Sequence, residues 1–98
     1  MNFKELLEAV KDENLPLEKI ESYRDALVHL HSAMQIERAT LKKAEALYFL
    51  KDKESTAVAI KMAWRGSQEG QRLLDIEAYI RAAVKEIDSL KSRVYRLI

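Results

Sequence analysis

"LLDIEAYIRAAVKEIDSLKSRVYRLI", from Leu73 to Ile98, is the stretch that decides the fold of this chain. Apolar residues recur along it at alternating spacings of three and four, the repeat of one face of an α-helix. They are Leu73, Ile76, Ile80, Ala83, Ile87, Leu90, Val94 and Leu97. The stretch therefore predicts one long amphipathic helix, over about residues 71–97, that buries this stripe against another helix.

A second stripe with the same repeat lies earlier in the chain. Its main positions are seven residues apart, and they are Ile20, Leu27, Met34, Leu41 and Tyr48. Tyr23, Leu30, Glu37 and Ala44 alternate with them, and Glu37 is the one member that does not suit an apolar seam. Pro16 suits the first turn of a helix, so we expect a helix over about residues 16–51. Two such stripes joined by a short turn predict a long antiparallel helical hairpin with coiled-coil-like packing.

Shorter elements complete the predicted fold. Phe3, Leu6, Leu7 and Val10 recur at helical spacing and predict a short N-terminal helix over about residues 2–13. It ends before Pro16, because the residue that precedes a proline is displaced from the α region. The polar cluster "KDKEST" supplies the turn of the hairpin, with Asp52, Ser55 and Thr56 as candidate caps.

Residues 56–65 are helical in composition, and "GSQEG" at 66–70 then holds both glycines of the protein. The helix either breaks at this point or continues and buries a different face, and we favour a break or kink. With only 98 residues the chain is expected to form a single all-α domain, residues 1–98.

The composition limits the classes of protein to consider. The chain is 48% hydrophobic and 34% charged, and it has two glycines, one proline and no cysteine. The absence of cysteine excludes disulfides and thiolate metal sites, and it fits a reducing compartment. No apolar run approaches the roughly 18 residues that a membrane span needs, and charges interrupt the start of the chain. We therefore expect a soluble cytoplasmic protein that does not enter a membrane.

The net charge of +1 hides a gradient along the chain. Residues 1–21 hold six acids and three lysines, whereas residues 81–98 hold five basic residues and two acids. The basic residues are Arg81, Lys85, Lys91, Arg93 and Arg96. They are the candidate contacts for nucleic acid, because phosphate binding needs several such residues. The alternative is a solvated face, or a match for the acidic N-terminal helix, and we favour this alternative.

The sequence offers little for catalysis or metal binding. His29 and His31 are two residues apart and point to different sides of a helix, so they cannot share a metal ion. Asp25 and His29 could provide two ligands of a metal site, but no third ligand is evident.

Glu37, if buried, would have a raised pKa and could act as a general base. The alternative is a partly exposed seam residue, or a glutamate paired with an arginine of a second chain. We expect no enzyme, no cofactor and no metal. A metal- or ligand-binding bundle centred on His29, His31 and Glu37 is the third and least favoured class.

"MAWRGSQEG", residues 62–70, is the most individual stretch of the chain. Trp64 and Arg65 are residue types that are enriched at binding hot spots, and Gln68 lies beside them. These three residues are the candidate contacts for a protein partner. The alternative is that Trp64 fills the end of the helical core.

The stripe of the last helix also predicts self-association. Its large members Ile80, Ile87, Leu90 and Val94 face a seam that contains Glu37, Ala44 and other small residues. We expect that this seam cannot cover them within one chain. A strip of apolar surface left in water favours pairing of two chains, most simply as a homodimer.

Residues 44–97 resemble small helical-hairpin proteins of tailed bacteriophages. The shared pattern is a helix that ends in "YFLK" (48–51), a short polar turn to Thr56, and a long helix that ends in "IDSLKSRVYRL" (87–97). The resemblance implies an accessory or host-interaction role and transfers no site residue. The leading hypothesis is a non-enzymatic helical module that binds a protein partner and regulates or inhibits a larger host or phage machine. The alternative is an accessory nucleic-acid-binding protein of replication or recombination.

Overall fold

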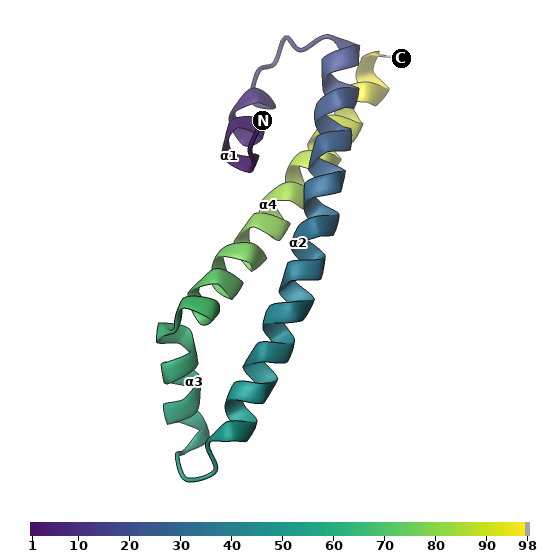
Figure 1. Ribbon diagram of the computed structural model, residues 1–98. Coiled ribbons are helices and arrows are strands. Elements are labelled where there is room, and N and C mark those ends of the chain that lie inside the picture. The colour runs from purple at the N-terminus through teal and green to yellow at the C-terminus, as the bar shows by residue number, and fades with distance from the viewer. Residues whose placement is uncertain (98) are drawn as a thin grey trace. The chain divides into compact units, whose positions relative to one another are not determined.

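The computed structural model describes residues 1–97, and this part of the chain forms four α-helices and no strand (Figure 1). The helices are α1 (Phe3–Ala9), α2 (Leu17–Lys51), α3 (Ala57–Gly66) and α4 (Gln68–Leu97). Helix α2 packs against α4, so the predicted all-α helical hairpin is confirmed. Within the described residues, none of the helices combines the length and apolar character that a membrane span requires.

Helix α1 begins with a capping box and ends earlier than the expected residue 13. The Asn2 side chain accepts a hydrogen bond from the Glu5 amide at 2.8 Å, and the Glu5 carboxylate accepts one from the Asn2 amide. The early end has a local cause. The Asn14 amide, which a longer helix would direct to the Val10 carbonyl, donates instead to the Asp12 side chain at 2.9 Å.

Helix α2 begins one residue after Pro16, whose carbonyl accepts hydrogen bonds from the amides of Lys19 and Ile20. At its other end the chain reverses through residues 52–56. The Asp52 carboxylate accepts hydrogen bonds from the amides of Glu54 and Ser55, and the Thr56 hydroxyl accepts one from the Ala59 amide. Thr56 is thus the N-cap of α3.

The chain forms two compact units, and each has its own core. Among the described residues, unit 1 comprises 1–33 and 80–97, and unit 2 comprises 34–79. The core of unit 1 joins α1, the first half of α2 and the second half of α4. Five of its buried side chains form one cluster, and they are Leu6, Val10, Ile20, Leu27 and Leu90.

The core of unit 2 joins the second half of α2, α3 and the first half of α4. Its buried apolar residues are Met34, Leu41, Ile60, Trp64, Leu73 and Ile76. Tyr48 packs against Trp64 edge to face, with ring centroids 5.5 Å apart. The second stripe therefore contributes to both cores. Ile20 and Leu27 are buried in unit 1, and Met34 and Leu41, at the same spacing of seven residues, are buried in unit 2.

The stripe of α4 is covered within one chain up to Val94, contrary to expectation, and only its last member, Leu97, is exposed, at 56%. Leu90 is 0% exposed, and Ile87 and Val94 pack against the same cluster. Ile80 is half-buried. The cover comes from the α1 segment as well as from α2, because Leu6 of α1 and Val10, the residue that caps its end, pack in the same cluster as Leu90. The expectation that a single chain leaves this stripe in water is therefore wrong, whereas self-association itself stays a prediction.

Candidate functional site

The junction between α3 and α4 is a one-residue break at Ser67. Its backbone is extended, and its amide donates to the Trp64 carbonyl at 3.0 Å, which closes α3. Its hydroxyl donates to the same carbonyl at 2.5 Å and accepts from the Gly70 amide at 3.0 Å, which caps α4. One serine thus ends one helix and begins the next. The sequence indicated a break here, but it did not indicate that Ser67 makes it.

Trp64 belongs to the core of unit 2. Its side chain is 3% exposed, so the core interpretation holds and the indole is not available as a surface anchor. The other two predicted partner contacts, Arg65 and Gln68, are exposed beside the junction. The Arg65 carbonyl accepts a hydrogen bond from the Gln71 side chain at 2.5 Å, which further ties α4 to α3.

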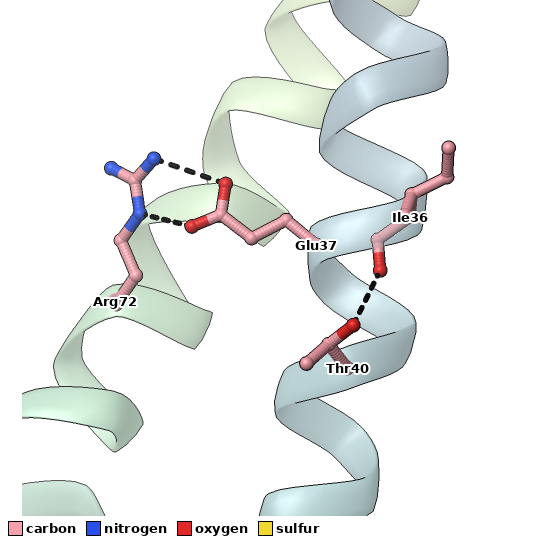
Figure 2. A network of polar contacts seen from close by, with 4 residues as sticks. All are labelled: Ile36, Glu37, Thr40 and Arg72. Carbon is pink, nitrogen blue, oxygen red and sulfur yellow. Dashed lines mark hydrogen bonds and ion pairs between the residues drawn. The ribbon is translucent and has the colours of Figure 1, made fainter.

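Glu37 forms a two-point ion pair with Arg72 (Figure 2). The two bonds measure 2.7 Å from Nε to Oε1 and 3.2 Å from Nη2 to Oε2, and they join α2 to α4 across unit 2. The hydrogen bond from Arg72 lowers the pKa of the Glu37 carboxyl below its ordinary value. A general base needs the opposite shift, and Glu37 is only partly buried. Glu37 is therefore a partly exposed seam residue, and its arginine belongs to the same chain.

The neighbouring polar contact in Figure 2 is local to α2. The Thr40 hydroxyl donates to the Ile36 carbonyl one turn earlier, at 3.2 Å. Such a bond satisfies the hydroxyl within its own helix.

The histidines do not form part of a ligand set. His29 is exposed and His31 is half-buried on α2. Among the described residues, no three or more His, Cys, Asp or Glu side chains are grouped so that they could hold a metal ion. None of the buried residues in this part of the chain is polar or charged.

The basic residues of α4 divide into two groups. Arg93 is half-buried, and its guanidinium donates to the Val10 carbonyl at 2.8 Å and to the Asp12 carbonyl. It therefore binds the end of α1, where a cation also meets the negative end of the helix dipole. The other four candidates are exposed, and they are Arg81, Lys85, Lys91 and Arg96.

A hollow of about 730 Å³ lies beside Arg93 and Arg96 in unit 1. Ser89 and Ser92 also line it, but so do Glu13 and Glu86. Lys11 also lines the hollow, so three cationic side chains meet two carboxylates there. Arg93 already donates to backbone carbonyls and the carboxylates offset most of the remaining charge, so the hollow is not a strong site for a phosphate group.

Sequence reasoning missed the apolar side chains that unit 2 leaves exposed. Their exposed fractions run from 51% for Leu74 to 71% for Ile36. The set comprises Ile36, Leu47, Leu50, Val58, Met62 and Leu74. A signal was present: the first three lie on α2 outside its seven-residue stripe, so that helix carries apolar residues on more than one side.

Comparison of the chain with models of known families, with curated proteins and with solved structures gives no match.

Proposed function

We propose that this protein is a non-enzymatic helical module that binds a protein partner through unit 2. The observation that supports it is the arrangement of the exposed apolar side chains in rows. Ile36 and Leu47 are eleven residues apart, close to three turns, so they lie on one side of α2 together with Leu50. Val58 and Met62 lie one turn apart on α3. Large apolar side chains that cluster on a surface mark interaction sites more often than single ones do.

The exposed rows have enough apolar area to drive binding. Fully burying one large aliphatic side chain stabilises by about 1.5–3 kcal/mol. Because these side chains are 51–71% exposed, a partner that covers several of them would gain part of this amount for each one, before the cost of association is subtracted. Arg65 and Gln68 extend this surface at the α3–α4 junction, while Trp64 supports it from the core. The resemblance to tailed-phage hairpin proteins supports regulation or inhibition of a larger machine, in the cytoplasm.

Site-specific photocrosslinking in the organism that encodes the protein tests this function. A photoreactive amino acid at Leu50 should give a discrete adduct with one protein, because this side chain is 69% exposed in unit 2. The same amino acid at Val84, an exposed position of unit 1, is the matched control and should give none. An absence of protein adducts at Ile36, Leu50 and Leu74 alike would refute the proposal.

The homodimer is a separate part of the proposal. It predicts a mass in light scattering of twice the 11.4 kDa of the single chain. Since Leu90 is buried within one chain, pairing has to use surface other than the α4 stripe. A monomer mass at micromolar concentration would remove this part and leave the interaction function unaffected.

Nucleic-acid binding is the second candidate function. The observation in its favour is that Arg81, Lys85, Lys91 and Arg96 are exposed on α4. Tyr95, next to Arg96 in the sequence, is also exposed, at 70%. Bases stack on such rings while basic residues contact phosphates. Fluorescence anisotropy with labelled single- and double-stranded DNA should then show an affinity that falls steeply with salt. Replacing Arg81, Lys85 and Arg96 by Gln should abolish it, and an unchanged affinity would refute this candidate.

A further inference from the structure

Helix α1 lies in an apolar groove that α2 and α4 form in unit 1. Leu6 of α1 and Val10, which caps its end, are buried in one cluster with Leu90 of α4. Ile20 and Leu27 supply the α2 side of the same cluster. The residues of the α1 segment that pack there follow the helical spacing i, i+3 and i+7, and they are Phe3, Leu6 and Val10. The groove thus accepts a short amphipathic helix, and α1 itself shows the pattern that fits.

Arg93 binds main-chain atoms at the end of the helix that lies in this groove. Its guanidinium donates to the Val10 carbonyl at 2.8 Å and to the Asp12 carbonyl. In a longer helix these carbonyls would accept hydrogen bonds from residues 14 and 16. The Asn14 amide donates instead to the Asp12 side chain, and Pro16 has no amide hydrogen. Arg93 therefore replaces two missing donors, and it recognises the end of a helix rather than a particular side chain.

Helix α1 is easier to displace than the two helices on which it packs. It has seven residues, whereas α2 has 35 and α4 has 30. A helix of seven residues is too short to be stable by itself in water, so α1 depends on the groove. Its link to α2, residues 10–16, lies outside the helices, and residues 11–14 are exposed. Such a link allows α1 to leave the groove while α2 stays in place.

The site continues beyond the end of α1. Lys11 and Leu15 of the link line the hollow of about 730 Å³, and Ser89 and Ser92 line it from α4. The link has to reach the start of α2 at Leu17, whereas the chain that follows a separate partner helix is free to enter the hollow. A partner can thus make contacts that α1 does not make. Displacement requires this difference, because a ligand shifts an equilibrium only by its differential affinity for the two states.

We propose that α1 is an autoinhibitory lid over a helix-binding groove of unit 1. The ligand is an amphipathic helix of a partner protein, with apolar residues at i, i+3 and i+7, that ends directly after the last of them. In the resting chain α1 occupies the groove with this same pattern, and the partner helix displaces it. The groove belongs to unit 1 and does not depend on the exposed rows of unit 2, so either proposal can fail without the other.

A labelled synthetic peptide of residues 1–12, with an amidated C-terminus, is the probe, because it carries the apolar pattern and both carbonyls that Arg93 binds. Fluorescence anisotropy measures its affinity for the full chain. The Leu6→Ser chain, whose own lid no longer fits, should bind it at least about tenfold more tightly than the unmutated chain, whose lid competes at a roughly millimolar effective concentration. Adding Arg93→Gln should weaken this binding by about tenfold or more. Adding Arg81→Gln, at an exposed position of α4, is the matched control and should not change it. A peptide with the Leu6→Ser change should bind neither chain.

A second variant loosens the lid and leaves every residue of the groove unchanged. Asn2 is exposed, and its side chain caps α1. Asn2→Ala should therefore raise the affinity of the chain for the peptide by about threefold to tenfold. Lys4→Ala, at an exposed position of the same helix outside the capping box, should leave the affinity unchanged.

Native-state hydrogen exchange on the unmutated chain tests the opening of the lid directly. The amides of α1 should exchange at least about tenfold faster than the Leu27 amide of α2, because the lid opens without global unfolding. Equal exchange rates, or a Leu6→Ser chain that unfolds or does not bind the peptide, would make α1 a permanent part of the core and overturn the proposal. Equal affinities of the unmutated and Leu6→Ser chains would place the peptide outside the groove. Self-association of the Leu6→Ser chain in light scattering, without peptide binding, would assign the opened groove to a second copy.

Discussion

Gly70 is the residue whose replacement tests the α3–α4 junction most directly. It is buried in the first turn of α4, and its backbone does not need positive φ. What it needs is space. A Cβ atom at this position would lie 1.8 Å from the Trp64 carbonyl oxygen and 2.7 Å from the Trp64 carbonyl carbon. Both are backbone atoms at the end of α3, so relief of the clash has to move one helix end away from the other.

The expected cost of Gly70→Ala follows from these contacts. Forcing an extra methyl group into a packed site costs about 1–3 kcal/mol. The Trp64 carbonyl is also the acceptor of the Ser67 amide and hydroxyl, so its displacement weakens the cap, worth about 1 kcal/mol. Alanine returns at most about 1 kcal/mol through its better helix propensity. The net destabilisation is then about 1–3 kcal/mol, which lowers Tm by roughly 4–8 °C for each kcal/mol in a domain of this size.

Thermal and urea denaturation, followed by circular dichroism, measure this effect. Gly66→Ala is the matched control, because a Cβ at Gly66 meets nothing within 4 Å. It should be neutral or slightly stabilising, whereas Gly70→Ala should be destabilising. Equal stability of the two variants would refute the close approach of the Gly70 and Trp64 backbones.

Three further variants test other contacts. Glu37→Gln should cost about 0.5–1 kcal/mol at neutral pH, since its exposed ion pair with Arg72 is bidentate but screened. The folded pKa of Glu37 is lowered, so this difference should be complete above the unfolded pKa of about 4.3 and should vanish as pH falls through the folded value. Urea titrations from neutral to acidic pH check the sign. Arg93→Gln should lose about 1–3 kcal/mol and speed hydrogen exchange of the α1 amides, whereas Arg96→Gln, at an exposed position, should change neither. Trp64→Ala should cost about 3–5 kcal/mol in thermal unfolding, and a stable variant would contradict its place in the core.

Local pattern determined the elements of this fold. Apolar residues seven apart, from Ile20 to Leu41, are all buried, as their spacing predicts. Pro16 and Thr56 also predicted where α2 and α3 begin. Each of them accepts hydrogen bonds from backbone amides three or four residues later, so the signal is local. The observed helices begin and end close to the predicted residues, apart from the early end of α1 at Ala9. These features depend on residues within a few positions of one another, and one sequence contains that information.

Candidate site residues were harder to place, since their environment depends on distant parts of the chain. Hot-spot statistics singled out Trp64, but they carry no information on which side of α3 is covered. Arg93 was grouped with the other basic residues of α4, although it binds carbonyl groups more than 80 residues away in sequence. Glu37 was an anomaly in its seam without a visible partner, and that partner is Arg72, 35 residues later.

The sequence by itself determined which side of each helix is apolar, because side-chain direction in a helix repeats every 3.6 residues. Only the tertiary structure decided what covers each apolar side. Helix α1 covers the α4 stripe together with α2, which is why Leu90 is buried in a single chain. The same packing leaves Leu47, Val58 and Met62 exposed. Burial depends on the distance between segments that are far apart in the chain, and no local repeat specifies that distance.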